Sequence, residues 1–403
     1  MHSLIQIITL SKNNSSFIKY LLNHVLSSIG DSFHFICVIS LLIDLTGTGI
    51  SATFGLIAYP LASIALSGLG GLIGDVFDNK TVIFSIDLIK ALIVSLFMMN
   101  IHLILIYILI FIMSCLDVLT SPSRKKLITG LLKKENILKG NSIIGGISGT
   151  IFLRFPLIAG NTISTYGVQS AFAIELLFIV SSIVPLLFIK PLKSNYSRIV
   201  NKNKFQKDRY LSPKNLLSTF KTFFLDINFK NIVIVSTFIC CLTASVNATF
   251  FPYAFNILGV SSKTFGIMLS IFYGSNIITT VLFFIISKYC ISQKVIFTIS
   301  FALLSMIWFM YSFLNSFYLV CSLQFLEGIC LSLITILITT KIQTVLPTKS
   351  MARMIGINEI INNAGKLLSL TCTTLLLQNI ECQKIFLLNS LLIIIFCVIN
   401  RKS

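Results

Sequence analysis

Long apolar runs alternate with short polar turns along the whole chain. A helix of about 20 apolar residues crosses the ~30 Å hydrocarbon core of a bilayer, and most of these runs reach that length. The pattern therefore predicts an all-α integral membrane protein with twelve transmembrane helices. The predicted spans are residues 17–43, 50–74, 80–99, 102–122, 138–162, 168–190, 231–256, 264–287, 293–313, 316–341, 352–377 and 383–400.

One long polar stretch, residues 191–230, divides these spans into two sets of six. It is rich in Lys and Arg, which is typical of a solvated segment on the cytoplasmic side of a membrane. We therefore predict a six-helix half over residues 1–190, a basic cytoplasmic linker over 191–230, and a second six-helix half over 231–403. The two halves are expected to be related by pseudo-symmetry.

The composition supports a membrane protein and excludes other classes. Of the 403 residues, 55% are hydrophobic and 11% are charged, whereas a soluble chain carries about 25% charged residues. A formal net charge of +18 could indicate nucleic-acid binding, but no soluble module offers a basic face, so no nucleic-acid partner is expected. The ten cysteines fall mostly within apolar runs and lack metal-ligand spacing, so no metal or other cofactor is expected.

The positions of the basic residues predict an orientation. If both termini are cytoplasmic, 27 of the 31 Lys and Arg residues lie on the cytoplasmic side or within two turns of it, and two face outward. Cytoplasmic loops hold the excess of positive residues in multi-pass membrane proteins. The sequence therefore predicts a protein of the inner (plasma) membrane with both termini in the cytoplasm.

The turn after the second span carries a glycine-rich motif, in which Gly70 and Gly74 have the four-residue spacing that allows two helices to approach closely. The segment that contains Gly71, Asp75 and Lys80 resembles the loop motif of the major facilitator superfamily. The resemblance implies that these residues form part of a gating charge cluster. It also implies the two-half, twelve-helix fold of that superfamily.

Other stretches extend the resemblance. Asp87 and Lys90 in the third span stand where the family often places an acid and a base, whereas Val76 and Asn79 replace expected basic residues of the loop motif. Those two substitutions weaken the predicted charge cluster.

The connection between the fourth and fifth spans points to one branch of the superfamily. Segments 121–124, 135–137 and 140–142 resemble the drug and siderophore exporter branch, which includes enterobactin exporters and macrolide efflux proteins. In the fifth span, Pro156 and Gly160 remain from a degraded version of the antiporter motif. The resemblance implies export by antiport.

Four ionisable residues fall near the middle of predicted spans: Asp31, Arg154, Glu327 and Lys366. A charged side chain at mid-membrane costs about 2.5–3.5 kcal/mol on insertion scales, so each is a candidate functional residue. Secondary transporters place the substrate and the coupling ion at this depth.

Asp31 belongs to a polar stripe with His24, Ser27 and His34 on one face of the first span. One hypothesis is that Asp31 binds and releases the coupling proton, with His34 as a relay or a substrate donor. The alternative is a structural acid bonded to a neighbouring helix. The sequence leaves both open.

Arg154 and Lys366 also allow two interpretations. They could bind an anionic substrate, since carboxylates and catecholates need fixed cations in a low-dielectric cavity. Alternatively, at least one of them pairs internally with Asp31 or Glu327, because an unpaired buried cation is costly.

Further polar residues are assigned by position. The family resemblance implies that spans one, four, seven and ten line the cavity, which makes Asn247, Gln324 and Glu327 candidate lining residues. Asp117 and Glu175 lie away from the span centres and are interpreted as structural or gating acids.

The function predicted from these features is secondary active transport, with proton-coupled export of a small molecule such as a siderophore or drug. Lysophospholipid movement, substrate uptake, and a non-transporting sensor or scaffold are the alternatives. The sequence contains no HExxH motif, no P-loop and no selectivity-filter repeat, so neither an enzyme nor a channel is expected. The expected partners are the substrate and the lipid bilayer, and the protein is expected to be a monomer powered by the proton gradient.

Overall fold

The computed structural model describes residues 14–99, 102–132, 136–189, 227–286, 292–345 and 351–400, apart from a few side chains within these ranges. The described chain is almost entirely helical, with twelve long helices and one π-helical turn. Residues 191–226 of the predicted linker lie outside the described residues, and its last four residues belong to helix α10, Ile227–Pro252.

Six helices form the N-terminal half. Their bounds are α2 Ser15–Thr46, α3 Ile50–Val76, α4 Asn79–Phe97, α5 Leu103–Leu131, α6 Ile137–Tyr166 and α7 Val168–Leu187. Helix α2 packs mainly against α6 and α7, and α3 packs against α5.

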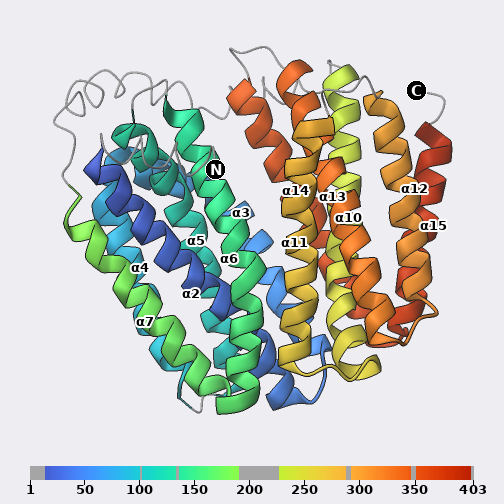
Figure 1. Cartoon of the computed structure of the whole chain (residues 1–403), viewed down its shortest axis with the longest axis horizontal. Helices are drawn as coiled ribbons and strands as arrows, with labels where there is room; N and C mark the ends of the chain where they lie inside the picture. Colours follow the sequence, from blue (N-terminus) through green and yellow to red (C-terminus); the bar gives the residue numbers. More distant parts are fainter. Residues whose placement is uncertain are drawn as a thin grey trace.

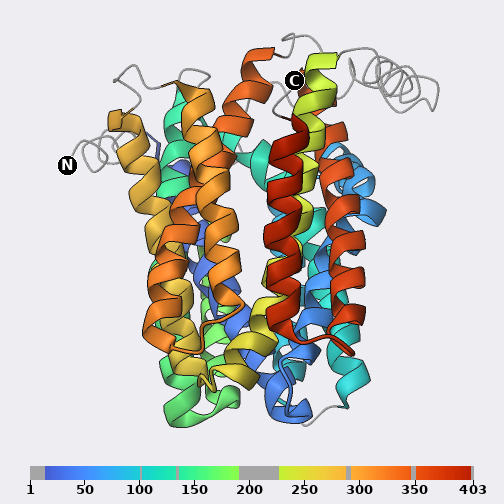
Figure 2. The ribbon, with the colours of Figure 1, turned by 90° about the vertical axis from the view of Figure 1, so that its right-hand side faces the viewer.

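The C-terminal half repeats this arrangement. Its helices are α10 Ile227–Pro252, continued by the π-helical turn η2 Tyr253–Ile257, and then α11 Ser262–Ile286, α12 Gln293–Tyr311, α13 Phe317–Val345, α14 Met351–Leu376 and α15 Cys382–Asn400. Helix α10 packs against α14 and α15, and α11 against α13 (Figure 2).

Eight of the helices in the described part of the chain are long and apolar enough to cross a membrane by length and composition. They are α2, α3, α5, α6, α7, α10, α12 and α13. The prediction of an all-α membrane protein is confirmed.

Local sequence explains where several helices begin and end. The Asn14 side chain accepts a hydrogen bond from the Phe17 amide (3.1 Å) at the start of α2, and Gly47 ends that helix in the left-handed conformation with φ 68°. One predicted boundary was wrong, because α5 was expected to end at Pro122. The helix instead continues through this proline to Leu131, which brings nine further residues into the bundle.

The two halves lie side by side, with α6 and α11 adjacent where they meet (Figure 1). We call the end of the bundle at which α7 ends and α10 begins the linker end, and the opposite end the far end. Several close contacts between the halves lie toward the far end. A Cβ atom added at Gly160 would collide with the backbone of Ser262, and the Ser40 and Ser262 hydroxyls are 2.8 Å apart. The far end of the bundle is therefore closed by direct packing.

Candidate functional site

The middle of the N-terminal half contains a shared ion pair. The ammonium group of Lys90 on α4 contacts two carboxylates, Asp117 of α5 and, at 3.5 Å, Asp31 of α2. Lys90 is 4% exposed, whereas the side chains of Asp31 and Asp117 are 45% and 44% exposed. We call these three residues, which are two carboxylates and the lysine between them, the carboxylate triad. A single buried cation thus holds two carboxylates that each keep an open side.

A second ionic layer lies toward the linker end from the triad. Arg124 of α5 donates to Asp87 (2.9 Å) and to the Ser27 hydroxyl (3.2 Å). Asn23 donates to Asp87 (3.3 Å) and to the Ser182 carbonyl of α7 (2.8 Å). Asp87 is fully enclosed by these partners, so this layer joins α2, α4, α5 and α7.

A third layer lies toward the far end. His34 Nδ1 is 2.9 Å from Glu175 Oε1, and Glu175 is completely buried. The other carboxylate oxygen of Glu175 has no hydrogen-bond partner in the described structure. The predicted stripe on α2 is thus divided among different neighbours, since His24 bonds Ser148 of α6 instead (2.9 Å).

Together the three layers hold more acid than base. They contain four carboxylates and two permanent cations, with His34 as a third group that becomes positive on protonation. An uncompensated charge in a low-dielectric interior is costly, so an excess carboxylate favours binding of a proton or a cation. The exposed sides of the triad are the places where such a charge can enter.

Asp31 faces the opposite half of the molecule. Phe35 lies one turn further along the same face of α2, and its ring is 6.4 Å from that of Phe251 on α10. Asn247, which is exposed, lies one turn from Phe251 toward the linker end. Asp31 and Asn247 therefore both lie on the linker-end side of an aromatic contact between the halves.

Asp117 also lies near this interface. Tyr59 of α3 is within electrostatic range of Asp117 in its own half and of Glu359 on α14. Nearby, Asn363 donates to Ser63 across the interface at 3.0 Å. The triad is thus located where the halves meet, at the middle of the helices.

The remaining predicted charged residues lie elsewhere. Arg154 is exposed on α6, and Lys366 on α14 is half-buried. Among the described residues neither forms an ion pair with Asp31 or Glu327, so the structure does not show the internal pairing that was one of the two interpretations.

Glu327 and Gln324 are interior residues of the C-terminal half, each 5% exposed. Glu327 accepts hydrogen bonds from Trp308 (2.8 Å) and Tyr311 (2.9 Å) of α12, which fixes α12 against α13. The structure thus packs both residues among helices, whereas the sequence analysis placed them on a cavity wall.

The glycine motif brings α3 and α5 together as predicted. A Cβ atom at Gly70 would lie 2.9 Å from the Val118 carbonyl, and one at Gly74 would lie 3.3 Å from the Ser123 hydroxyl. Lys80 donates to the Leu187 carbonyl at the end of α7 (3.0 Å). Gly71 borders open space, and the Asp75 side chain lies outside the described part of the structure.

The residues of the antiporter-like motif lie at the interface between the halves. Gly160 approaches Ser262, and a Cβ atom on Gly266 of α11 would collide with the backbone of Pro156. Small residues here allow α6 and α11 to make backbone contact. Their position fits a helix pair that must separate when the far end opens.

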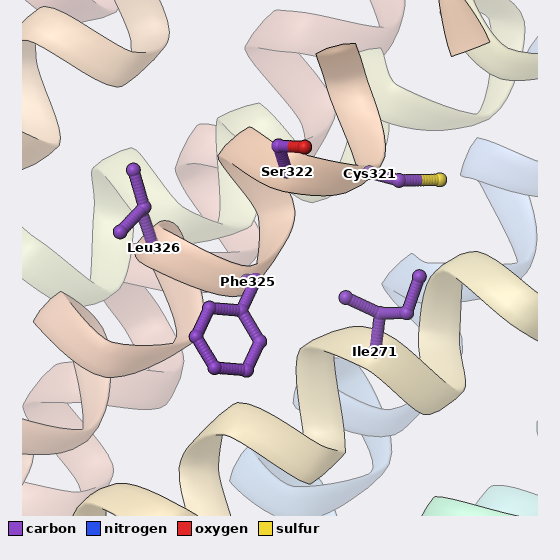
Figure 3. Close-up of a pocket in the computed structure, with 5 residues that line it drawn as sticks. All are labelled: Ile271, Cys321, Ser322, Phe325 and Leu326. Atoms are coloured by element: carbon purple, nitrogen blue, oxygen red, sulfur yellow. The ribbon is translucent and has the colours of Figure 1, made fainter. Parts of the chain in front are cut away.

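A shallow apolar groove of about 470 Å³ lies between α11 and α13, lined by Ile271, Cys321, Ser322, Phe325 and Leu326 (Figure 3). Its lining includes no carboxylate and no basic side chain, and it lies in the C-terminal half, away from the triad. Phe325 and Leu326 are exposed, as expected for side chains that face lipid. We assign no transport role to this groove.

The sequence analysis missed three parts of the site. The predicted fourth span ended at Pro122, so Arg124 was not named as a site residue. Asp117 and Glu175 were treated as peripheral, although their partners Lys90 and His34 place them in the triad and the layer beside it. The repeated acid and base positions at mid-span were the available signal. No group of three or more His, Cys, Asp or Glu side chains in the described residues could hold a metal ion.

Comparison with known proteins identifies a family and more distant relatives. The family model described as Major Facilitator Superfamily matches residues 15–236 and 233–401. A Bacillus subtilis protein described as an uncharacterized MFS-type transporter, YfiS, is 25% identical over 181 residues, which is 45% of this chain. The matched region spans 43% of that relative's length.

Solved structures share the fold at low sequence identity. A peptide transporter of the POT type bound to alafosfalin has a TM-score of 0.72 and 10% identity, with 96% of this chain and 93% of that chain covered. The nucleoside transporter NupG has a TM-score of 0.72 and 14% identity, covering 94% and 97%. A POT transporter bound to 5-aminolevulinic acid has a TM-score of 0.68 and 13% identity, covering 96% and 94%.

Proposed function

The chain belongs to the Major Facilitator Superfamily and is a multi-pass membrane transporter, and from this premise we propose that it is a proton-coupled exporter of small amphipathic molecules. We place it in the drug and siderophore exporter branch, in the inner membrane, with both termini cytoplasmic. The observation that carries the proposal is the carboxylate triad.

The triad has the chemistry required for coupling. Asp31 touches one cation at 3.5 Å and keeps 45% of its side chain exposed, so a proton or an organic cation can reach it. Binding of one neutralises the carboxylate and weakens the attraction for the other. Exchange of substrate for proton at Asp31, and with it Asp117, then couples the two flows.

The conformation agrees with loading from the cytoplasm. Under the proposed orientation the linker end faces the cytoplasm, and the contacts of Gly160 and Ser40 with Ser262 close the periplasmic side. An exporter binds its substrate in this state. The partial antiporter motif at the same contact also supports export over uptake.

The charge balance favours a substrate with a basic group over a wholly anionic siderophore. Lys90 and Arg124 are already paired with carboxylates, and Arg154 is exposed away from the triad. The N-terminal wall therefore presents excess negative charge. Drug-like cations match this wall better than catecholates do.

The test is efflux in a bacterial host without its main export pumps. Cells that express the wild type should retain less rhodamine 123 and less macrolide than cells with empty vector, and a protonophore should abolish the difference. Asp31→Asn should lose efflux, whereas Asp44→Asn, an exposed acid on the same helix, should keep it.

Other outcomes would redirect the assignment. Lower secretion of siderophore by an iron-starved knockout of the natural host would move the substrate to siderophores. Increased uptake of lysophospholipid or of the dye would reverse the direction. Full efflux by Asp31→Asn would exclude the triad from coupling, and no transport in any assay would favour a sensor or scaffold.

A further inference from the structure

Lys366 is a cation without an ionic partner at the middle of α14. Among the described residues, no carboxylate lies within ion-pairing distance of its ammonium group. The thiols of Cys240 and Cys241 on α10 lie near its ammonium group. In the N-terminal half, Lys90 and Arg124 both have carboxylate partners, whereas Arg154 is exposed on α6.

The neighbours of Lys366 on the helix show which way it faces. Four residues before it, Asn362 accepts a hydrogen bond from Thr237 of α10 (2.8 Å), and three residues before it, Asn363 donates to Ser63 of α3 (3.0 Å). Residues three and four apart share a helix face. Lys366 therefore lies on the side of α14 between α10 and α3.

An apolar junction lies directly beyond Lys366 toward the far end. Leu370, one turn along α14, packs with Ala248 of α10, and Leu56 of α3 packs against both. This junction packs the three helices together on the far-end side of Lys366. Lys366 thus lies one helical turn from this junction, on its linker-end side.

The carboxylate triad borders the same side of the closure. Asp31 lies one turn toward the linker end from the contact between Phe35 of α2 and Phe251 of α10. Ala248 of α10 belongs to the apolar junction that lies on the far-end side of Lys366. One helix, α10, therefore runs between the two sites. Excess negative charge lies on the N-terminal wall, whereas on α14 of the C-terminal wall Lys366 stands two turns from the exposed Glu359 and forms no ion pair with it.

We propose that Lys366 is an anion subsite, and that the transported molecule is amphoteric, with a basic group for Asp31 and Asp117 and a carboxylate or similar oxyanion for Lys366. An ammonium group at mid-membrane is costly when it is unpaired, and an oxyanion gives it a charge-assisted hydrogen bond. This inference rests on the proposed function, because it assigns the substrate class of the same transport site.

Two dyes with the same ring system test the subsite. Rhodamine 110 carries a free carboxylate, and rhodamine 123 is its methyl ester, so the pair differs at the anionic group alone. Binding of each dye to the purified full-length protein in detergent is measured by fluorescence anisotropy. The wild type should bind rhodamine 110 about tenfold more tightly, which corresponds to about 1.4 kcal/mol.

The variants identify the residue. Lys366→Gln should abolish the preference for rhodamine 110 and leave the affinity for rhodamine 123 within about twofold, and Lys366→Arg should keep the preference. The control is Lys384→Gln, which removes an exposed lysine paired with Glu381 (3.2 Å) and should change neither affinity. If the glutamine variant fails to fold, the comparison of the two dyes with the wild type still tests the inference.

Equal affinity of the wild type for the two dyes, no binding of rhodamine 110, or an unchanged preference in Lys366→Gln would overturn the inference. The proposed function has a separate readout, namely protonophore-sensitive efflux of rhodamine 123 that depends on Asp31. Absence of the rhodamine 110 preference in the wild type, with intact efflux, would refute the anion subsite alone. Loss of efflux would refute the proposed function.

Discussion

Replacement of Arg124 should destabilise the protein much more than replacement of Lys90, although both are interior cations of the same half. Arg124→Gln leaves the Asp87 carboxylate 1% exposed, with the Asn23 amide at 3.3 Å as its remaining side-chain partner. Removal of one member of a buried ion pair costs about 3–5 kcal/mol, because the other charge stays in a low-dielectric interior.

Lys90→Gln has a different consequence. The two carboxylates it leaves, Asp31 and Asp117, are nearly half-exposed and can be hydrated or protonated. We expect a cost of about 1–2 kcal/mol, between the values for surface and buried pairs. The difference in exposure between Asp87 and the triad therefore sets the order of the two effects.

The assay is thermal unfolding in detergent, followed with a dye that fluoresces on reaction with thiols. Buried Cys37 and Cys330 react when the bundle opens, so no label has to be introduced. The double variant with Asp87→Asn and Arg124→Gln should recover at least half of the loss in transition temperature, because the buried unpaired charge is gone. Equal destabilisation by Arg124→Gln and Lys90→Gln, or a double variant less stable than Arg124→Gln alone, would refute this reasoning.

Three further predictions concern the closed far end and the C-terminal half. Gly160→Leu should disfavour the closed far end by about 1–3 kcal/mol, seen as faster labelling of thiols placed at the far end. Gly145→Leu, with nothing within 4 Å of an added Cβ, should have no such effect. In a background without native cysteines, the double variant Ser40→Cys with Ser262→Cys should form a disulfide under oxidation and lose transport until the disulfide is reduced. Transport that survives complete cross-linking would exclude separation of the two halves at the far end. Glu327→Gln should alter the emission of the chain's one tryptophan and leave proton coupling intact, so a loss of coupling would move Glu327 into the transport site.

The pattern of apolar runs was sufficient to predict the fold class. Each long helix of the structure overlaps a predicted span, because burial in lipid demands long apolar helices whatever their neighbours are. Helix ends were harder to predict when they depended on context. A proline often ends a helix, yet Pro122 lies within α5, and the nine residues beyond it include Arg124.

The site was predicted only in part for a related reason. Sequence spacing places residues on a face of one helix, so Asp31 and His34 were found from their own segment. Their partners Lys90 and Glu175 come from helices 59 and 141 positions along the chain from them, and which helices meet is decided by packing of the whole half. Lys366 was found by its depth in the membrane, but its lack of a partner required the packed structure.

The most direct test of the central claim is gradient-driven transport in proteoliposomes that contain the purified protein and rhodamine 123. With the wild type, an imposed pH difference of one unit should drive up to about tenfold accumulation of dye per exchanged proton, and Asp31→Asn should bind the dye without accumulating it. Accumulation by Asp31→Asn equal to that of the wild type, or accumulation by the wild type without a gradient, would contradict proton coupling at the carboxylate triad.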